Sequence, residues 1–123
     1  MINADCVVIG DTIAYNLGIP LACEVRAAPS MTSSHIINIS GGAYHTYCII
    51  SAGKYDYWNP FLNRNLASIR NQSSCKYYVW VIPNNSIAAI AVVNEAQKHH
   101  DITIPYSTDI NVISNNIKME TGN

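Results

Sequence analysis

A threonine follows glycine and aspartate at the point where an apolar run of the sequence gives way to a helical pattern. The three residues are Gly10, Asp11 and Thr12. A hydroxyl at such a strand-to-helix turn is a position from which a nucleophile works in α/β enzymes, provided that a base takes its proton. Thr12 is therefore the first candidate for chemistry in this chain.

Two carboxylates lie near the ends of apolar runs, Asp11 after the first run and Asp56 after a later one. Such a pair can divide the work of an acid and a base if the two side chains share a site. Carboxylates in these positions also cap backbone N–H groups. We favour separate caps, with Asp11 on the first helical turn and Asp56 on the loop that follows it.

The segment 53–60 gathers Tyr55, Tyr57 and Trp58 beside these carboxylates. An aromatic cluster of this kind packs a loop over a sheet end, stacks on a sugar ring or binds a partner surface. The residues expected around a binding pocket at this edge are Asp11, Thr12, Gly53, Tyr55, Asp56 and Trp58.

None of the four histidines has the sequence position of a general base for Thr12. His35 follows the second predicted strand and is the one histidine expected to approach the threonine. His45 opens a strand, and His99 and His100 end a helix, so all three are expected at the opposite edge of a parallel sheet.

The four cysteines, Cys6, Cys23, Cys48 and Cys75, show no CxxC spacing. We predict buried free thiols, because nothing in the sequence marks an oxidising compartment. The spacing does not indicate a metal site, and no metal or other cofactor is expected.

Short apolar runs alternate with helical periods along the whole chain. This alternation predicts an α/β fold with three layers, α/β/α, in which a doubly wound, five-stranded parallel sheet is covered on both faces. Sites in such sheets lie beyond the carboxyl ends of the strands. The predicted strands are 4–10, 22–28, 44–53, 76–83 and 101–106, the predicted helices are 11–18, 32–39, 59–72 and 86–100, and the tail is polar with a short helix at most.

The composition describes one folded domain, residues 1–123, with few charges. The chain is 49% hydrophobic and 12% charged, with a net charge of −1. A nucleic-acid partner is not expected without a basic surface, and no stretch is long enough to span a membrane. Near-zero net charge favours association with protein partners. The first residues lack the basic start of a signal peptide, so synthesis in the cytoplasm is expected.

Two segments resemble blocks of the SGNH (GDSL-like) hydrolases. "VVIGDTIAYNLG" (7–18) is similar to the first block, which reads Gly-Asp-Ser, and "IISAGKYD" (49–56) is similar to the third. The order and spacing of the elements extend the resemblance over roughly residues 4–118, and the rhythm is that of small, single-domain members, many of them phage-encoded. The resemblance implies a flavodoxin-like fold.

The resemblance also implies that the catalytic machinery is degenerate. Thr12 stands at the position of the nucleophilic serine, Ala27 (or Ala28) at an oxyanion-hole glycine, and Tyr55 at an oxyanion-hole asparagine. Ile113 stands at the position of the histidine base. The family's aspartate lies three residues before that histidine, whereas Asp109 lies four before Ile113.

A hydroxyl without a base is a poor nucleophile near neutral pH. We therefore expect a non-catalytic, binding or structural subunit of a larger assembly, such as a decoration or tail component of a phage virion. One alternative is a carboxylic or carbohydrate esterase that uses Thr12 as its nucleophile. The other is a carbohydrate-binding module in which the aromatic cluster contacts a glycan.

Overall fold

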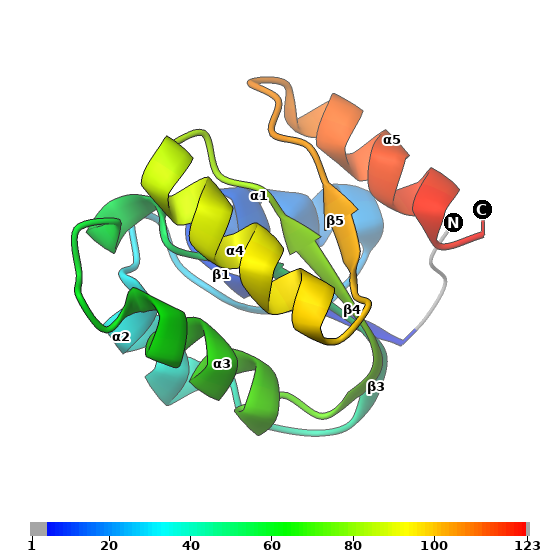
Figure 1. Ribbon diagram of the computed structural model, residues 1–123. Helices are drawn as coiled ribbons and strands as arrows, with labels where there is room; N and C mark the ends of the chain where they lie inside the picture. The colour runs from blue at the N-terminus through cyan, green and yellow to red at the C-terminus, as the bar shows by residue number, and fades with distance from the viewer. Residues whose placement is uncertain (1–4, 123) are drawn as a thin grey trace.

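The computed structural model describes residues 5–122, which form a parallel sheet between two layers of helices (Figure 1). The strand order is β2-β1-β3-β4-β5, and all neighbouring strands are parallel. This is the flavodoxin-like order, so the predicted fold class is confirmed. The strands are β1 (Cys6–Gly10), β2 (Glu24–Ala27), β3 (His45–Ser51), β4 (Cys75–Val81) and β5 (Ile102–Ile104).

The helices divide between the two faces of the sheet. One face is covered by α1 (Thr12–Leu21) and α5 (Ile110–Glu120), and the other by α2 (Ser33–Ile36), α3 (Leu62–Gln72) and α4 (Ser86–Lys98). Residues 5–122 also contain two short 3₁₀ helices, η1 (Ile37–Ile39) and η2 (Lys54–Asp56). The segment 32–39, predicted as one helix, is therefore α2 followed by η1.

Each helical layer has its own hydrophobic core, because strand side chains alternate between the faces. In β1, Val7 and Ile9 pack beneath α2, α3 and α4, whereas Val8 packs beneath α1 and α5. Trp80 of β4 is fully buried and donates a hydrogen bond from Nε1 to Asp101, 3.0 Å away. The continuous apolar sequence of the central strands is thus explained by burial on both sides.

Helix α1 is longer than predicted, since it passes through Gly18 and ends at Leu21. A Cβ atom at residue 18 would lie 2.5 Å from a methyl carbon of Val25, so the glycine lets α1 approach β2 closely. The left-handed residue that ends the helix is Ala22, whose N–H bonds to the carbonyls of Gly18 and Ile19. The glycine serves helix–strand packing here and does not terminate the helix.

The predicted helix 59–72 starts three residues later in the structure, whereas the predicted helix 86–100 starts at the expected residue. The Oδ1 atom of Asn59 accepts the N–H of Phe61 at 2.9 Å, which makes a turn before α3 begins at Leu62. Helix α4 is capped by Asn85, which accepts from two backbone N–H groups, and Ser86 is its first residue. In both places an asparagine side chain stabilises the turn that leads into the helix.

The tail contains more structure than its polar sequence indicated. Helix α5 has 11 residues, is capped by Asp109 and buries Ile113 and Ile117 in the core that it shares with α1. The intervening Asn and Ser residues mask this spacing, which is one apolar position per helical turn.

The prediction of free thiols was wrong. Cys6 is bonded to Cys23 and Cys48 to Cys75, with Cα–Cα distances of 4.9 and 5.8 Å. These distances lie in the range that a disulfide spans, roughly 4.4–6.8 Å. The cysteines are far apart in sequence, and the pairing of adjacent strands brings them together.

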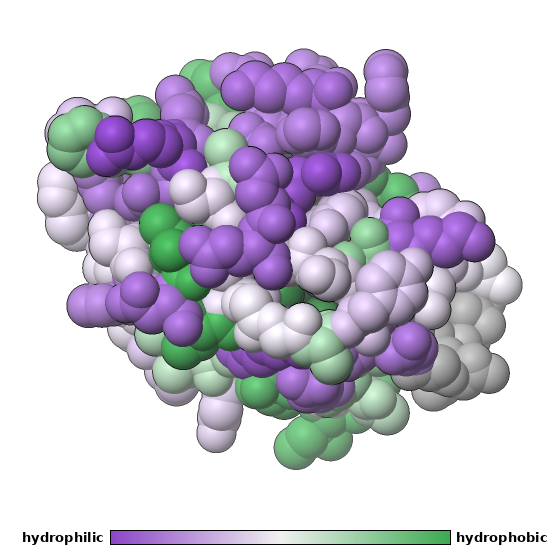
Figure 2. Space-filling model, turned by 90° about the horizontal axis from the view of Figure 1, so that it is seen from below, coloured by the Kyte–Doolittle hydropathy of each residue, from purple (hydrophilic) through white to green (hydrophobic). Residues whose placement is uncertain are grey.

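The chain carries few charges, since 12% of its residues are Asp, Glu, Lys or Arg. Figure 2 shows the face over α2 and α3, where hydrophilic and near-neutral residues surround small hydrophobic patches. Within residues 5–122, no helix has the length and apolarity needed to cross a bilayer.

Candidate functional site

The turn after β1 lies at the carboxyl edge of the sheet and depends on a glycine. Gly10 has φ +140°, and a Cβ atom there would lie 1.8 Å from the carbonyl oxygen of Ser51. That carbonyl also accepts the N–H of Asp11 at 3.0 Å. The close approach of β1 and β3 at this point fixes the direction in which Asp11 and Thr12 leave the sheet.

The hydroxyl of Thr12 is held by two neighbours. Its oxygen lies 3.0 Å from the hydroxyl oxygen of Tyr55 and accepts the N–H of Ser30 at 2.9 Å. Sequence reasoning placed Thr12 and Tyr55 in one site, and the structure brings them into direct contact. Among residues 5–122, no histidine ring is hydrogen-bonded to this hydroxyl.

Asp11 caps α1, as the sequence predicted. Its Oδ1 atom accepts the hydroxyl of Ser51 at 2.7 Å and the N–H of Ile13 at 3.3 Å. Burial raises the pKa of the carboxyl to about 6, against the smaller opposing effects of Ser51, Ile13 and Lys54. A carboxyl with this pKa carries a proton in part of the molecules near neutral pH.

Asp56 is also buried, but its partners differ from those of Asp11. Its carboxylate accepts the N–H of Ser33 at 2.9 Å and the hydroxyl of the same residue at 2.5 Å, and Asn59 donates to it at 3.3 Å. Asp56 therefore caps the start of α2, whereas we had expected it to cap the loop that follows residue 56. Separate hydrogen-bond partners support the interpretation of two caps over that of a carboxylate pair.

Two further positions of the expected site hold apolar side chains. Ala27 ends β2 and lies in register with Gly10. Ile113 is fully buried in the core beneath α5, so this position carries no group that takes a proton. The carboxylate of Asp109, at the start of the same helix, accepts the N–H of Asn111 at 2.9 Å.

The histidines are engaged elsewhere. His35 is exposed, and its Nδ1 lies 3.1 Å from the hydroxyl of Thr32. His99 follows α4, and its Nε2 lies 3.1 Å from a carboxylate oxygen of Glu95. No base for a hydroxyl nucleophile is therefore found at these positions.

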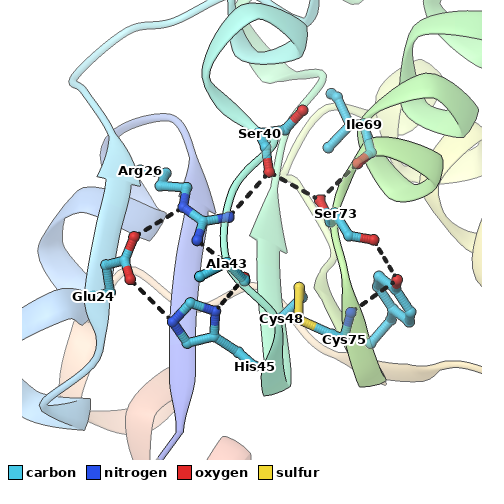
Figure 3. Close-up of a disulfide and its surroundings, with 10 residues drawn as sticks. Glu24, Arg26, Ser40, Ala43, His45, Cys48, Ile69, Ser73 and Cys75 are labelled. Atoms are coloured by element: carbon cyan, nitrogen blue, oxygen red, sulfur yellow. Dashed lines mark hydrogen bonds and ion pairs between the residues drawn. A yellow bond between two sulfur atoms is a disulfide. The ribbon is translucent and has the colours of Figure 1, made fainter.

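His45 belongs to a polar network at the amino edge of the sheet, which the sequence did not reveal (Figure 3). Its ring nitrogens lie 2.8 Å from the carbonyl oxygen of Ala43 and 3.0 Å from Glu24. Arg26 donates to Glu24 at 2.9 Å and to the carbonyl oxygens of Ser40 and Ala43. Hydrogen bonding to Arg26 is the largest effect that lowers the pKa of Glu24. The one signal in the sequence was the spacing Glu24-x-Arg26, which places both side chains on one face of a strand.

A groove lies between α4 and the N-terminal end of α3, on the face opposite α1. We define the α3–α4 groove by two adjoining cavities of about 270 and 470 Å³ that share Asn63, Ala91 and Asn94. The smaller cavity is also lined by Tyr57, and Trp58 packs edge-on against this tyrosine with ring centroids 5.3 Å apart. The predicted aromatic cluster therefore divides, with Tyr55 on Thr12 and Tyr57 and Trp58 beside the groove.

The comparisons with protein-family models, curated proteins and solved structures give no match to this chain. In the part of the chain that the structure describes, no cluster of three histidine, cysteine or acidic side chains has the geometry to hold a metal ion.

Proposed function

We propose that this protein is a non-catalytic relative of the SGNH-like hydrolases and acts as a binding or structural subunit of a larger assembly. The observation that carries the proposal is the state of Thr12. Its hydroxyl bonds to Tyr55 and Ser30, while the position of the family's base is Ile113, buried in the core. A hydroxyl whose proton has no acceptor base does not attack an ester at a useful rate.

An assembly role is supported by the surface. Tyr15 and Ile19 lie one turn apart on the outer side of α1, and Ile19 is 93% exposed. Apolar side chains on a surface with few charges favour contact with another protein. The two disulfides suit a component that works in oxidising surroundings, such as the outside of a virion.

The first test is hydrolysis of p-nitrophenyl acetate by the purified protein and by the variant Thr12→Ala. We expect both proteins to release nitrophenol at the same background rate. Turnover by the wild type that disappears in Thr12→Ala would instead support an esterase with a threonine nucleophile.

The second test concerns the assembly. We expect the wild-type protein from its native source to co-sediment with a larger particle, and Ile19→Ser to be released from it. The matched control is Asn16→Ser, an exposed polar position on the same helix. If the wild-type protein sediments as a monomer from its native source, the assembly role is wrong.

A further inference from the structure

We propose that the α3–α4 groove is a binding site for a neutral oligosaccharide that carries N-acetyl groups, an inference that rests on the proposed binding role. The groove starts next to Tyr57 and runs along α4 to Gln97 and Lys98, and α3 lines it only through its first two residues, Leu62 and Asn63. It is separate from the hydrogen-bonded cluster around Thr12.

The size of the groove suits several sugar units. Small-molecule sites have volumes of roughly 300–1,000 Å³, and the larger of the two cavities, about 470 Å³, lies in this range. The two cavities adjoin, because three residues line both of them. A linear ligand that extends along α4 would therefore occupy both.

The polar lining consists mainly of side-chain amides. Asn63, Asn94 and Gln97 each present a carbonyl oxygen that accepts and an NH₂ group that donates. Sugar hydroxyls both donate and accept, so each amide can pair with neighbouring hydroxyls of one ring. The two charged lining residues, Glu95 and Lys98, have opposite signs and lie 3.6 Å apart, so they add no net charge to the groove.

The apolar lining of the groove provides the contacts that bind the apolar parts of the ligand. Ile87 and Ile90 of α4 are 57% and 63% exposed, and they line the cavity next to Tyr57. An acetamido group has a methyl carbon that such isoleucines cover and an amide that pairs with Asn63 or Asn94. The flat face of a pyranose ring stacks on an aromatic side chain.

Other classes of ligand match this lining less well. An anionic polymer requires several cations, whereas Lys98 is the one cationic residue among those that line the groove, and Glu95 lies beside it. A purely apolar ligand would bury the amides of Asn63 and Asn94 without hydrogen-bond partners, which opposes its binding. A neutral ligand with both hydroxyl and acetyl groups can form hydrogen bonds with the amides and apolar contacts with the isoleucines of the groove.

The experiment is a calorimetric titration of the intact protein with the tetrasaccharide of β-1,4-linked N-acetylglucosamine. The matched glucose tetrasaccharide, which lacks acetamido groups, is titrated in parallel. We expect the N-acetylated tetrasaccharide to bind about tenfold or more tightly than its glucose counterpart. Absence of binding overturns the proposal, and equal affinity for the two sugars overturns its assignment to N-acetylated ligands.

Variants locate the site. The double substitution Asn63→Ala and Asn94→Ala is expected to weaken binding at least tenfold, because two pairs of hydrogen bonds are lost. The control replaces the exposed Asn16 and Asn115, on the opposite helical layer, by alanine and is expected to keep the wild-type affinity. Circular dichroism verifies that all proteins are folded. Equal weakening in both double variants overturns the location.

The sugar titration and the ester assay test the two proposals independently of each other. Ester hydrolysis that depends on Thr12 would refute the non-catalytic role without changing the affinity of the groove. Absence of sugar binding would refute the groove as a glycan site and leave the sedimentation test of the assembly role intact.

Discussion

Replacing Asp11 by asparagine is expected to stabilise the protein at neutral pH and to remove part of its pH dependence. Asp11 accepts both of its hydrogen bonds through one oxygen, Oδ1, from Ser51 and Ile13. An asparagine keeps that acceptor and places an NH₂ group where the second carboxyl oxygen lies. The variant therefore imitates the protonated acid without its ability to ionise.

The magnitude follows from the pKa of Asp11, which burial raises from 3.8 to about 6. A raised pKa means that the folded state binds the proton more tightly than the unfolded state. The resulting stabilisation is fully present below pH 3.8 and is lost as the pH rises through about 6. The difference between a pKa of 3.8 in the unfolded chain and about 6 in the folded one corresponds to about 3 kcal/mol between these limits.

The assay is urea unfolding of the wild type and Asp11→Asn at about pH 4 and about pH 7.5. The free energy of unfolding of the variant, relative to wild type, is expected to rise by about 2.5 kcal/mol between the two pH values. Contributions from other groups, including Glu24, cancel in this difference. Asn16→Ala, at an exposed position of helix α1, is the control and should change stability by the same amount at both pH values, because neither side chain ionises.

The result that would refute this reasoning is a constant difference between Asp11→Asn and wild type at the two pH values. Asp11 would then ionise equally easily in the folded and unfolded chains, and its burial beneath the turn would have no electrostatic cost.

Three further outcomes are expected. Removal of the Cys48–Cys75 disulfide by the double substitution Cys48→Ala and Cys75→Ala, which opens a loop with a sequence separation of 27, should lower the free energy of unfolding by about 3.5 kcal/mol from chain entropy alone, as measured by urea unfolding of the variant and the wild type without a reductant. The substitution Ile113→Ala should cost about 2–5 kcal/mol in the same assay, because it empties a fully buried position; a cost below about 1 kcal/mol would contradict the packing of α5. Gly10→Ala should leave little folded protein by circular dichroism, because its Cβ would overlap the carbonyl of Ser51, and a normal spectrum and stability would show that the turn has another conformation.

The fold was predictable because its signals are local. Apolar runs and helical periods alternate along the chain, and the parallel flavodoxin-like sheet follows from that alternation. Among the predicted helices and strands, the tail was predicted least accurately, because Asn and Ser residues surround Ile113 and Ile117 and conceal the apolar face of α5. Gly18 also led to a wrong helix end in the prediction of α1, because glycine both ends helices and permits close packing.

Contacts between distant segments were predictable only where topology alone implied them. Thr12 and Tyr55 follow neighbouring strands, and their hydroxyls do meet. The bond between Asp56 and Ser33 depends on how a loop folds back over the sheet edge, which no periodicity encodes. The disulfides depend in the same way on which strands become neighbours.

The arrangement of the disulfides bears on the order in which the chain can be oxidised. Four cysteines allow three pairings, one sequential, one nested and one interlaced. Here the pairing is sequential, since the loop closed by Cys6 and Cys23 ends before the loop closed by Cys48 and Cys75 begins. Each bridge needs only its own segment of chain, so the first can form on a growing polypeptide before the second pair of cysteines has emerged. Neither bridge has to open for the other to close.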